Sequence, residues 1–459
     1  MRIMNQRNTR IYKRALLLAV PMMIQNGITN AVGLVDNLMV GSLGTESMTA
    51  VAIAGQLFFV FNLAVFGGLS GPGIFGAQYY GRGDTEGVRN IFRLKWWISL
   101  FCVALGALVF LFGGNALISL YLRGEGNGID AGLTLTLGRE YMLIMLAGLL
   151  PFGITQVYSS SLRETDESVK PLVAGICAVV TDVLLNYLLI FGKCGLPRLG
   201  VKGAAVATVL SRFVELAVIV VLAHKNTAKH KFLQNVYHTM RVPLAVLKPA
   251  LRKGFPIFIN EFLWSGGIAV LTQCYSIRGL NVVAGLNISN AICNMLNVVF
   301  VALGNAVGIV IGQMLGARQF DEAKKDSIRL MWFSGAVSAG VALVLLAISG
   351  VFPQAYDTSQ EVRRYGQFFI MITASFFPVQ ALLNALYFTL RSGGKTVITF
   401  VFDSFYTWVV SVPAAFVLCN FTTIPILGIY AIVQALDLIK VTVGYILVKK
   451  GVWITSLVE

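Results

Sequence analysis

Long apolar runs alternate with short polar segments along the whole chain of 459 residues. A helix that crosses the hydrocarbon of a bilayer needs about 20 mostly apolar residues, whereas the strands of a membrane barrel show short segments of alternating polarity. The runs here are long and nearly continuous, so we expect helices. Twelve runs qualify, at residues 15–41, 48–79, 94–120, 134–160, 170–192, 201–223, 251–277, 282–315, 328–352, 366–390, 396–419 and 427–447.

The composition supports the same fold class, an all-α polytopic membrane protein. Hydrophobic residues make up 56% of the chain and charged residues only 12%, whereas a soluble domain carries about a quarter of its residues as charged side chains. The first apolar run follows a basic stretch, as in a signal peptide, but it continues well past the usual length and lacks a small-x-small cleavage site. We therefore expect it to be the first transmembrane helix.

The chain repeats itself in two halves. The pairs at an offset of 235 residues are Pro21 with Pro256, Gly44 with Gly279, Gln78 with Gln313, and Gly81 with Gly316. The pairs at an offset of 228 residues are Arg163 with Arg391, Pro197 with Pro425, and Arg212 with Lys440. The change of offset falls in the Gly-rich segment 123–128. Six spans per half give both copies the same orientation, the parallel kind of repeat found in secondary transporters.

The repeat predicts two pseudo-symmetric six-helix lobes joined by a polar linker. We expect an N-lobe at 1–223, a solvated cytoplasmic linker at 224–250, and a C-lobe at 251–459. The linker carries all three histidines of the chain, at spacings that match no zinc motif. We expect it to lie on anionic lipid headgroups.

Basic residues predict the orientation. With the N-terminus inside, 26 of the 36 Lys and Arg residues fall in inner segments and 8 in outer loops, as the positive-inside rule requires. We expect a multi-pass protein of the inner (plasma) membrane with both termini in the cytoplasm. The net charge of +15 is thereby explained by contact with the bilayer, and we expect no nucleic-acid partner.

Motifs for other chemistry are absent from the sequence. The G-x-G-x-x-G at Gly71–Gly76 lies inside an apolar run, and the P-loop lookalike at Gly394–Thr396 lacks its first glycine. We therefore expect no bound nucleotide and no cofactor. An intramembrane enzyme would need a nucleophile with its base, metal ligands or paired Asp motifs. No intramembrane His and no Asp-x-x-Asp occurs, so we expect no enzymatic activity.

Acidic residues inside the spans are the main candidates for function. A charged side chain at a helix centre costs about 2.5–3.5 kcal/mol on insertion scales, so an unpaired one is by default functional. The six acids are Asp36, Asp182, Glu215, Glu261, Asp403 and Asp437. Arg212 is three residues from Glu215, and Lys440 three from Asp437, so these two acids are predicted to form local ion pairs.

The other four acids have no cation within helical reach. Asp36 and Asp182 each share a helical face with small and polar residues, as expected for a helix that lines a wet cavity. Both lie towards the outer side of the first half. A carboxylate there could exchange a proton near neutral pH or hold Na⁺ with neighbouring oxygens. Glu261 and Asp403 lie deeper on the cytoplasmic side and are secondary candidates.

Several motifs, in order, resemble the multidrug and toxic compound extrusion (MATE) family. They are Asp36-Asn-Leu-Met-Val-Gly41-Ser-Leu-Gly44, Gln78-Tyr-Tyr-Gly81, Asn186-Tyr-Leu-Leu-Ile-Phe-Gly192, Gly203-Ala-Ala-Val-Ala-Thr208 and Gly312-Gln-Met-Leu-Gly316. The resemblance extends over the whole chain and includes the twelve-helix, two-lobe plan. It implies export of organic cations and amphipathic compounds in exchange for H⁺ or Na⁺.

The resemblance also implies a coupling site. The family's first-lobe positions fall on Asp36, Asp182, Asn186 and Thr208, where either H⁺ or Na⁺ could bind. Many relatives carry Asn and then Asp four residues later, whereas this chain has Asp182 and then Asn186, so the two groups are exchanged on one face. A functional second-lobe Glu of some relatives corresponds to Glu261.

The sequence thus predicts a secondary antiporter for small organic molecules that works by alternating access. We expect a monomer. The alternative is a flippase for a lipid-linked or amphipathic metabolite, which should line its cavity with basic residues, whereas the candidates here are acidic.

Overall fold

The structure is a computed structural model that describes residues 2–122, 130–225 and 229–458. These residues are almost entirely helical and contain no strand. Twelve helices within the described ranges are long and apolar enough to cross a membrane. The predicted all-α, twelve-span fold class is therefore confirmed. The Gly-rich segment 123–128, where the repeat changes its offset, lies outside the described residues.

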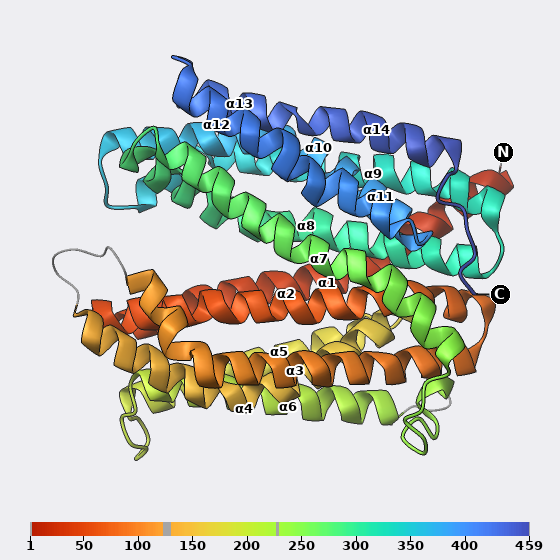
Figure 1. Ribbon diagram of the computed structural model, residues 1–459, viewed down its shortest axis with the longest axis horizontal. Helices are drawn as coiled ribbons and strands as arrows, with labels where there is room; N and C mark the ends of the chain where they lie inside the picture. Colours follow the sequence, from red (N-terminus) through yellow and green to blue (C-terminus); the bar gives the residue numbers. More distant parts are fainter. Residues whose placement is uncertain (1, 123–129, 226–228, 459) are drawn as a thin grey trace. The chain divides into compact units, whose positions relative to one another are not determined.

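The first six spans are continuous helices (Figure 1). They are α1 (Arg2–Gly41), α2 (Thr45–Arg82), α3 (Thr85–Leu122), α4 (Ala131–Glu164), α5 (Val169–Phe191) and α6 (Val201–His224). Most of them extend beyond the apolar runs. Helix α3 begins at Thr85 rather than at residue 94, because its first polar turns find protein partners in place of lipid.

The second half is less regular. Its first four spans are α7 (Leu244–Ser276), α8 (Leu280–Gly316), α9 (Phe320–Ile348) and α10 (Gln360–Ser392). The run predicted to end at residue 352 stops at Ile348, and a short 3₁₀ helix, η2 (Phe352–Ala355), follows.

The last two spans are interrupted helices. The eleventh comprises α11 (Thr396–Phe400), the π-helical turns η3 (Val401–Phe405) and η4 (Thr407–Ser411), and α12 (Val412–Phe421). The twelfth comprises α13 (Ile426–Ala435) and α14 (Asp437–Lys450), with a break at Leu436. Local π-helical turns are frequent at functional sites, and η3 contains Asp403.

The described chain forms two compact units. The first unit comprises residues 24–76 and 85–249, and the second unit comprises residues 1–23, 77–84 and 250–459. The beginning of α1 and the end of α2 thus pack with the C-terminal half of the chain rather than with the helices that follow them.

A reciprocal helix crossing explains why the end of α2 belongs to the second unit. A Cβ atom on Gly81 would lie 1.9 Å from the backbone oxygen of Gln313 in α8, and a Cβ on Gly316 would lie 1.9 Å from that of Gln78. These four residues are the pairs of the internal repeat. Only glycine allows two helix backbones to approach this closely.

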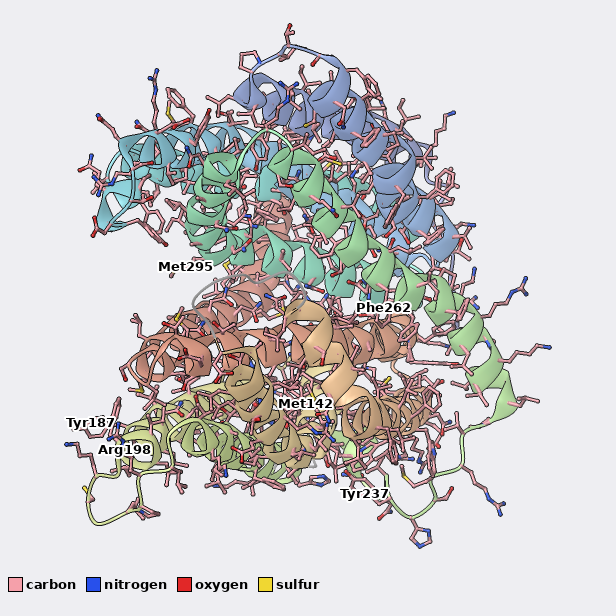
Figure 2. The ribbon with its side chains drawn as sticks, turned by 60° about the vertical axis from the view of Figure 1, so that its left-hand side comes forward. Met142, Tyr187, Arg198, Tyr237, Phe262 and Met295 are labelled. Carbon is pink, nitrogen blue, oxygen red and sulfur yellow. The ribbon has the colours of Figure 1, made fainter. Side chains whose placement is uncertain are left out.

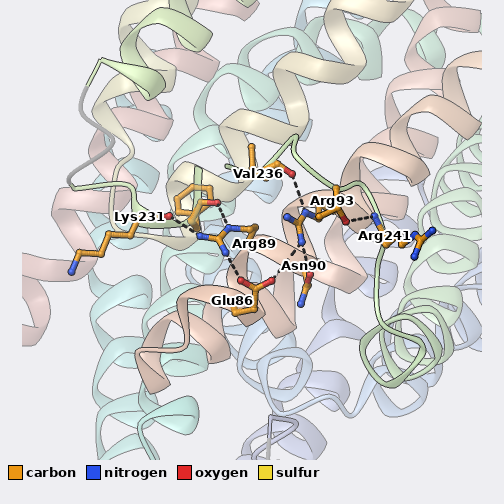
Figure 3. A network of polar contacts seen from close by, with 9 residues as sticks. Glu86, Arg89, Asn90, Arg93, Lys231, Val236 and Arg241 are labelled. Atoms are coloured by element: carbon orange, nitrogen blue, oxygen red, sulfur yellow. Dashed lines mark hydrogen bonds and ion pairs between the residues drawn. The ribbon is translucent and has the colours of Figure 1, made fainter. Parts of the chain in front are cut away.

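The segment between α6 and α7, which includes the 3₁₀ helix η1 (Lys231–Leu233), packs on α3 of the first unit (Figure 3). Arg89 donates to the carbonyl of Phe232 at 3.3 Å, and Arg93 donates to that of Val236 at 3.0 Å. Trp97 continues the row by donating to Met240 at 2.9 Å.

Phe232, Leu233 and Val236 of this segment are buried, as is His230, whereas Tyr237 is 46% exposed. Burial and the nearby ammonium of Lys170 lower the pKa of the His230 imidazole. The expectation of a solvated linker is therefore wrong for His230, Phe232, Leu233 and Val236, whereas Lys231, Gln234 and Asn235 are exposed. The sequence signal was the presence of Phe232, Leu233 and Val236 among the charges.

Candidate functional site

The first unit brings three of the predicted site residues into direct contact. The side-chain amide of Asn186 donates to Oδ1 of Asp36 at 2.8 Å and to Oδ2 of Asp182 at 3.2 Å. Asp182 and Asn186 are four residues apart on α5, so they share one face of that helix, and Asp36 comes from α1. The two carboxylates are therefore linked through a single amide group.

Helices α4 and α6 provide the other polar groups of this cluster. The hydroxyls of Thr208 and Ser211 on α6 lie near Asp182, and that of Ser211 donates to the backbone oxygen of Thr208 at 2.8 Å. Tyr141 on α4 reaches Thr208 and faces both carboxylates. Thr208 was expected at the site. Tyr141 and Ser211 were not, because nothing in the sequence distinguishes them from other polar residues on apolar helices.

The faces of these helices differ sharply in exposure. Met142, next to Tyr141 on α4, is fully buried, whereas Tyr187, next to Asn186 on α5, is half exposed (Figure 2). Asp182 and Asn186 are themselves buried, so the α5 part of the acid cluster is directed into the first unit. We call Asp36, Asp182, Asn186 and Thr208 the first-unit acid cluster.

Two oxygen atoms of the cluster lack a hydrogen-bond partner. Asp182 is 6% exposed and Asn186 is 1% exposed, and Oδ1 of each is buried without any donor. A buried acceptor without a donor costs about 1–3 kcal/mol, and more when it is charged. A proton or a cation bound at these oxygens would remove that cost.

Two guanidinium groups of the first unit lie near Glu215, and one of them also acts on the acid cluster. Arg212 pairs with Glu215 at 3.1 Å, which confirms the predicted local ion pair, and also lies over the ring of Phe152 at 5.1 Å. Its charge acts on both Asp36 and Asp182.

Arg163 of α4 is the second of these guanidinium groups. It donates to Oε1 of Gln25 at 2.7 Å, and Glu215 and Glu164 act on its charge. Its own Nε is buried without a partner. No sequence signal placed Arg163 near the site, because it was counted as a loop residue.

The secondary candidates, Glu261 and Asp403, lie together in the second unit. Asn260 of α7 donates to Oδ2 of Asp403 at 2.9 Å and reaches the hydroxyl of Tyr387 of α10 at 3.4 Å. Glu261 lies within electrostatic reach of Asp403 and of Arg391. Asn260 was missed because it is one of many amides in the apolar runs.

The second predicted ion pair is also confirmed. Asp437 pairs with Lys440 at 2.9 Å and accepts a hydrogen bond from Gln380 at 2.5 Å. Within the described ranges, no group of three or more His, Cys, Asp and Glu side chains could hold a metal ion. The oxygen atoms of the first-unit acid cluster instead belong to two carboxylates, an amide and a hydroxyl.

Twelve spans with buried, hydrogen-bonded carboxylates are typical of a secondary membrane transporter. The MatE family model matches residues 21–188 and 256–417 of this chain. The chain belongs to that family, whose members are transporters and not enzymes.

The relatives extend along nearly the whole chain. The probable multidrug resistance protein YoeA of Bacillus subtilis is 26% identical over 454 residues, which cover 98% of this chain and 96% of YoeA. The probable multidrug resistance protein NorM of Thermotoga maritima is 24% identical over 445 residues, which cover 96% of this chain and 93% of that protein.

Solved structures share the fold. An outward-facing multidrug resistance MATE transporter of the MOP superfamily superposes with a TM-score of 0.85 at 19% identity, covering 96% of each chain. A Pyrococcus furiosus transporter of that superfamily gives 0.83 at 19% identity, covering 96% of this chain and 95% of the other. The binding pocket of the latter is described as having reversed polarity, which suggests a different function for it.

Proposed function

We propose that this protein is a secondary antiporter that exports organic cations and amphipathic drugs or metabolites in exchange for H⁺ or Na⁺. The first-unit acid cluster binds the coupling ion, and the exported compound competes with that ion as the protein alternates between inward and outward openings. The observation that carries the proposal is the linked pair of carboxylates, with the buried Oδ1 of Asp182 lacking a donor. The multidrug resistance names of the relatives support it.

The donor set suits either coupling ion. A proton would bind to a carboxylate oxygen and supply the missing hydrogen-bond donor. Na⁺ would instead bind the carboxylates with the oxygens of Asn186 and Thr208. Glu261 and Asp403 form a second candidate site in their own unit. The coupling ion is itself transported, and no cofactor takes part.

A flippase for a lipid-linked or amphipathic metabolite is the alternative. It would need basic groups free to bind an anionic headgroup. The two guanidinium groups beside the first-unit acid cluster, Arg163 and Arg212, each face Glu215 instead. The acidic polarity of the cluster therefore favours a cationic compound.

The location follows from the basic residues. We place the protein in the inner (plasma) membrane as a monomer, with both termini and the segment 224–250 in the cytoplasm, between lobes at 1–223 and 251–459. The 26 inner against 8 outer basic residues support this orientation.

Drug export by everted membrane vesicles tests the antiport. The Asp36→Asn variant keeps the shape of the side chain but removes its charge, so it should abolish export driven by an imposed H⁺ or Na⁺ gradient. It should still fold, because a neutral amide is cheaper to bury than a carboxylate. The matched control is Asp357→Asn, at an exposed acid outside the spans. Wild-type export by Asp36→Asn, at equal protein level, would place the ion site elsewhere.

A further inference from the structure

The positive and negative charges in and around the first-unit acid cluster do not add up to zero. Asp36 and Asp182 lie within electrostatic reach of Arg212, and Glu215 lies within reach of both Arg212 and Arg163, so the three acids are connected with two permanently charged guanidinium groups. With every group ionised, the five side chains carry one net negative charge. The two cations come from α4 and α6, and the acids from α1, α5 and α6, so the packing of four helices sets this balance.

These five groups form one continuous electrostatic cluster. Arg212 pairs with Glu215 at 3.1 Å, and its charge also acts on the carboxylates of Asp36 and Asp182. Arg163 faces Glu215 from the other helix. Uncharged Tyr141, Asn186, Thr208 and Ser211 complete the surroundings of the two aspartates.

The nearby ion pair of Lys95 with Glu164 adds nothing to this balance. Its atoms lie 2.6 Å apart, and the pair is neutral as a whole. The pair of Lys202 with Glu140 is likewise neutral and is exposed. The one uncompensated charge therefore belongs to the cluster of Asp36, Asp182, Glu215, Arg163 and Arg212.

The second unit repeats the balance with other acids. Glu261, Asp403 and Asp437 face Arg391 and Lys440, again three acids with two cations. The cations occupy the repeat positions of Arg163 and Arg212, whereas none of the acids does. The acids thus occupy different repeat positions in the two halves, whereas the net charge of the two clusters is the same.

Asp182 and Glu215 are buried, and an uncompensated charge among buried carboxylates is costly, so a proton or another cation compensates it. We propose that Arg163 and Arg212 limit the first-unit acid cluster to one positive charge at a time, and so select singly charged organic cations that exchange for one H⁺ or Na⁺. Glu215 contributes to this charge limit, because its pairing with Arg212 prevents Arg212 from neutralising the aspartates. The inference rests on the proposed antiport and adds the charge of the substrate.

Charge-changing variants give opposite outcomes. The Glu215→Gln variant brings the net charge of the cluster to zero, since Arg212 can then pair with Asp36 and Asp182. The Arg212→Gln variant brings it to two negative charges. The double variant Arg212→Gln/Glu215→Gln restores one negative charge although it carries both changes, and it is the matched control for the loss of either side chain.

Binding of two probe cations to the purified full-length protein in detergent tests the inference. The probes are tetraphenylphosphonium, with one positive charge, and methyl viologen, with two, and the H⁺ or Na⁺ released on binding is measured with the affinity. The wild-type protein should bind tetraphenylphosphonium with the release of one ion. Glu215→Gln should bind it about tenfold more weakly, and the double variant should recover the wild-type affinity.

The Arg212→Gln variant provides a second test of the inference, which does not depend on the folding of Glu215→Gln. Methyl viologen should bind Arg212→Gln about tenfold more tightly than it binds the wild type, with two ions released, and Arg212→Lys should behave as the wild type. Size-exclusion profiles identify the folded variants.

Two results separate this inference from the antiport itself. If the wild type releases one ion but Glu215→Gln binds tetraphenylphosphonium equally well, or the double variant binds it as weakly as Glu215→Gln, the charge balance does not set the substrate charge. If the wild type releases neither H⁺ nor Na⁺, the proposed antiport fails as well.

Discussion

Lys95 illustrates what a buried charge requires of the residues around it. Its side chain has no exposed surface, and its ammonium donates to both carboxylate oxygens of Glu164, at 2.6 and 2.8 Å. Helix α2 leaves room for that carboxylate, since a Cβ atom on Gly76 would lie 2.3 Å from Oε2 of Glu164. The pair thus links α3 to α4 beneath a glycine of α2.

Removal of one partner of this pair should be strongly destabilising. The Lys95→Met variant removes the ammonium that donates to both oxygens of the buried Glu164, and we expect a cost of about 3–5 kcal/mol. The matched control is Lys202→Met, whose pair with Glu140 is 51% and 37% exposed and should contribute about 0–1 kcal/mol. Apparent melting temperatures in detergent compare the two variants. Equal, small shifts would mean that the Lys95 pair is effectively solvated.

Some site residues could be predicted from sequence and others could not. Asp36 and Asp182 could be predicted because an acid inside an apolar run is costly and needs a reason, and Asn186 and Thr208 followed from the family resemblance. Tyr141 and Arg163 could not, because their place beside the acids depends on how α4 packs on its neighbours. Only the folded chain brings these helices together.

At the scale of the elements, the crossing of α2 and α8 is a tightly constrained contact of the second unit. The backbone oxygen opposite Gly81 belongs to the main chain of Gln313 and cannot rotate away. The Gly81→Ala variant therefore forces the two helices apart, and we expect a cost of about 1–3 kcal/mol, typical of overpacking. Thermal unfolding and the yield of monodisperse protein measure it.

Gly340 in α9 provides the control for that substitution. A Cβ atom there would meet nothing within 4 Å, so Gly340→Ala should leave the apparent melting temperature equal or higher, since alanine favours helix by about 1 kcal/mol. If Gly81→Ala were as stable as Gly340→Ala, the close approach of α2 and α8 would be refuted.

The number of spans could be predicted, but their ends and interruptions could not. An apolar run indicates only the part of a helix that lies in lipid. The predicted third span therefore begins after the polar turns of α3 that bind the segment 230–240. The π-helical turns around Asp403 could not be predicted, because the residues Val401–Ser411 form part of an ordinary apolar run in the sequence.

At the scale of the whole molecule, the two halves of the sequence and the two compact units divide the chain differently. The paired residues at offsets of 235 and 228 predicted two similar six-helix lobes. They could not predict that residues 1–23 and 77–84 pack with the second unit, because that depends on contacts between distant segments, such as Gly81 with Gln313. The repeat nevertheless preserves the positions of two cations in each half, Arg163 and Arg212 in the first and Arg391 and Lys440 in the second.

The central claim is that the exported cation and the coupling ion exclude one another from one acidic site. The most direct measurement adds tetraphenylphosphonium to the purified wild-type protein in weakly buffered solution and follows pH and bound Na⁺ together. We expect the release of one H⁺ or one Na⁺ for each tetraphenylphosphonium ion bound, and no release from Asp36→Asn. Saturable binding of tetraphenylphosphonium to the wild type without the release of either ion would contradict the account.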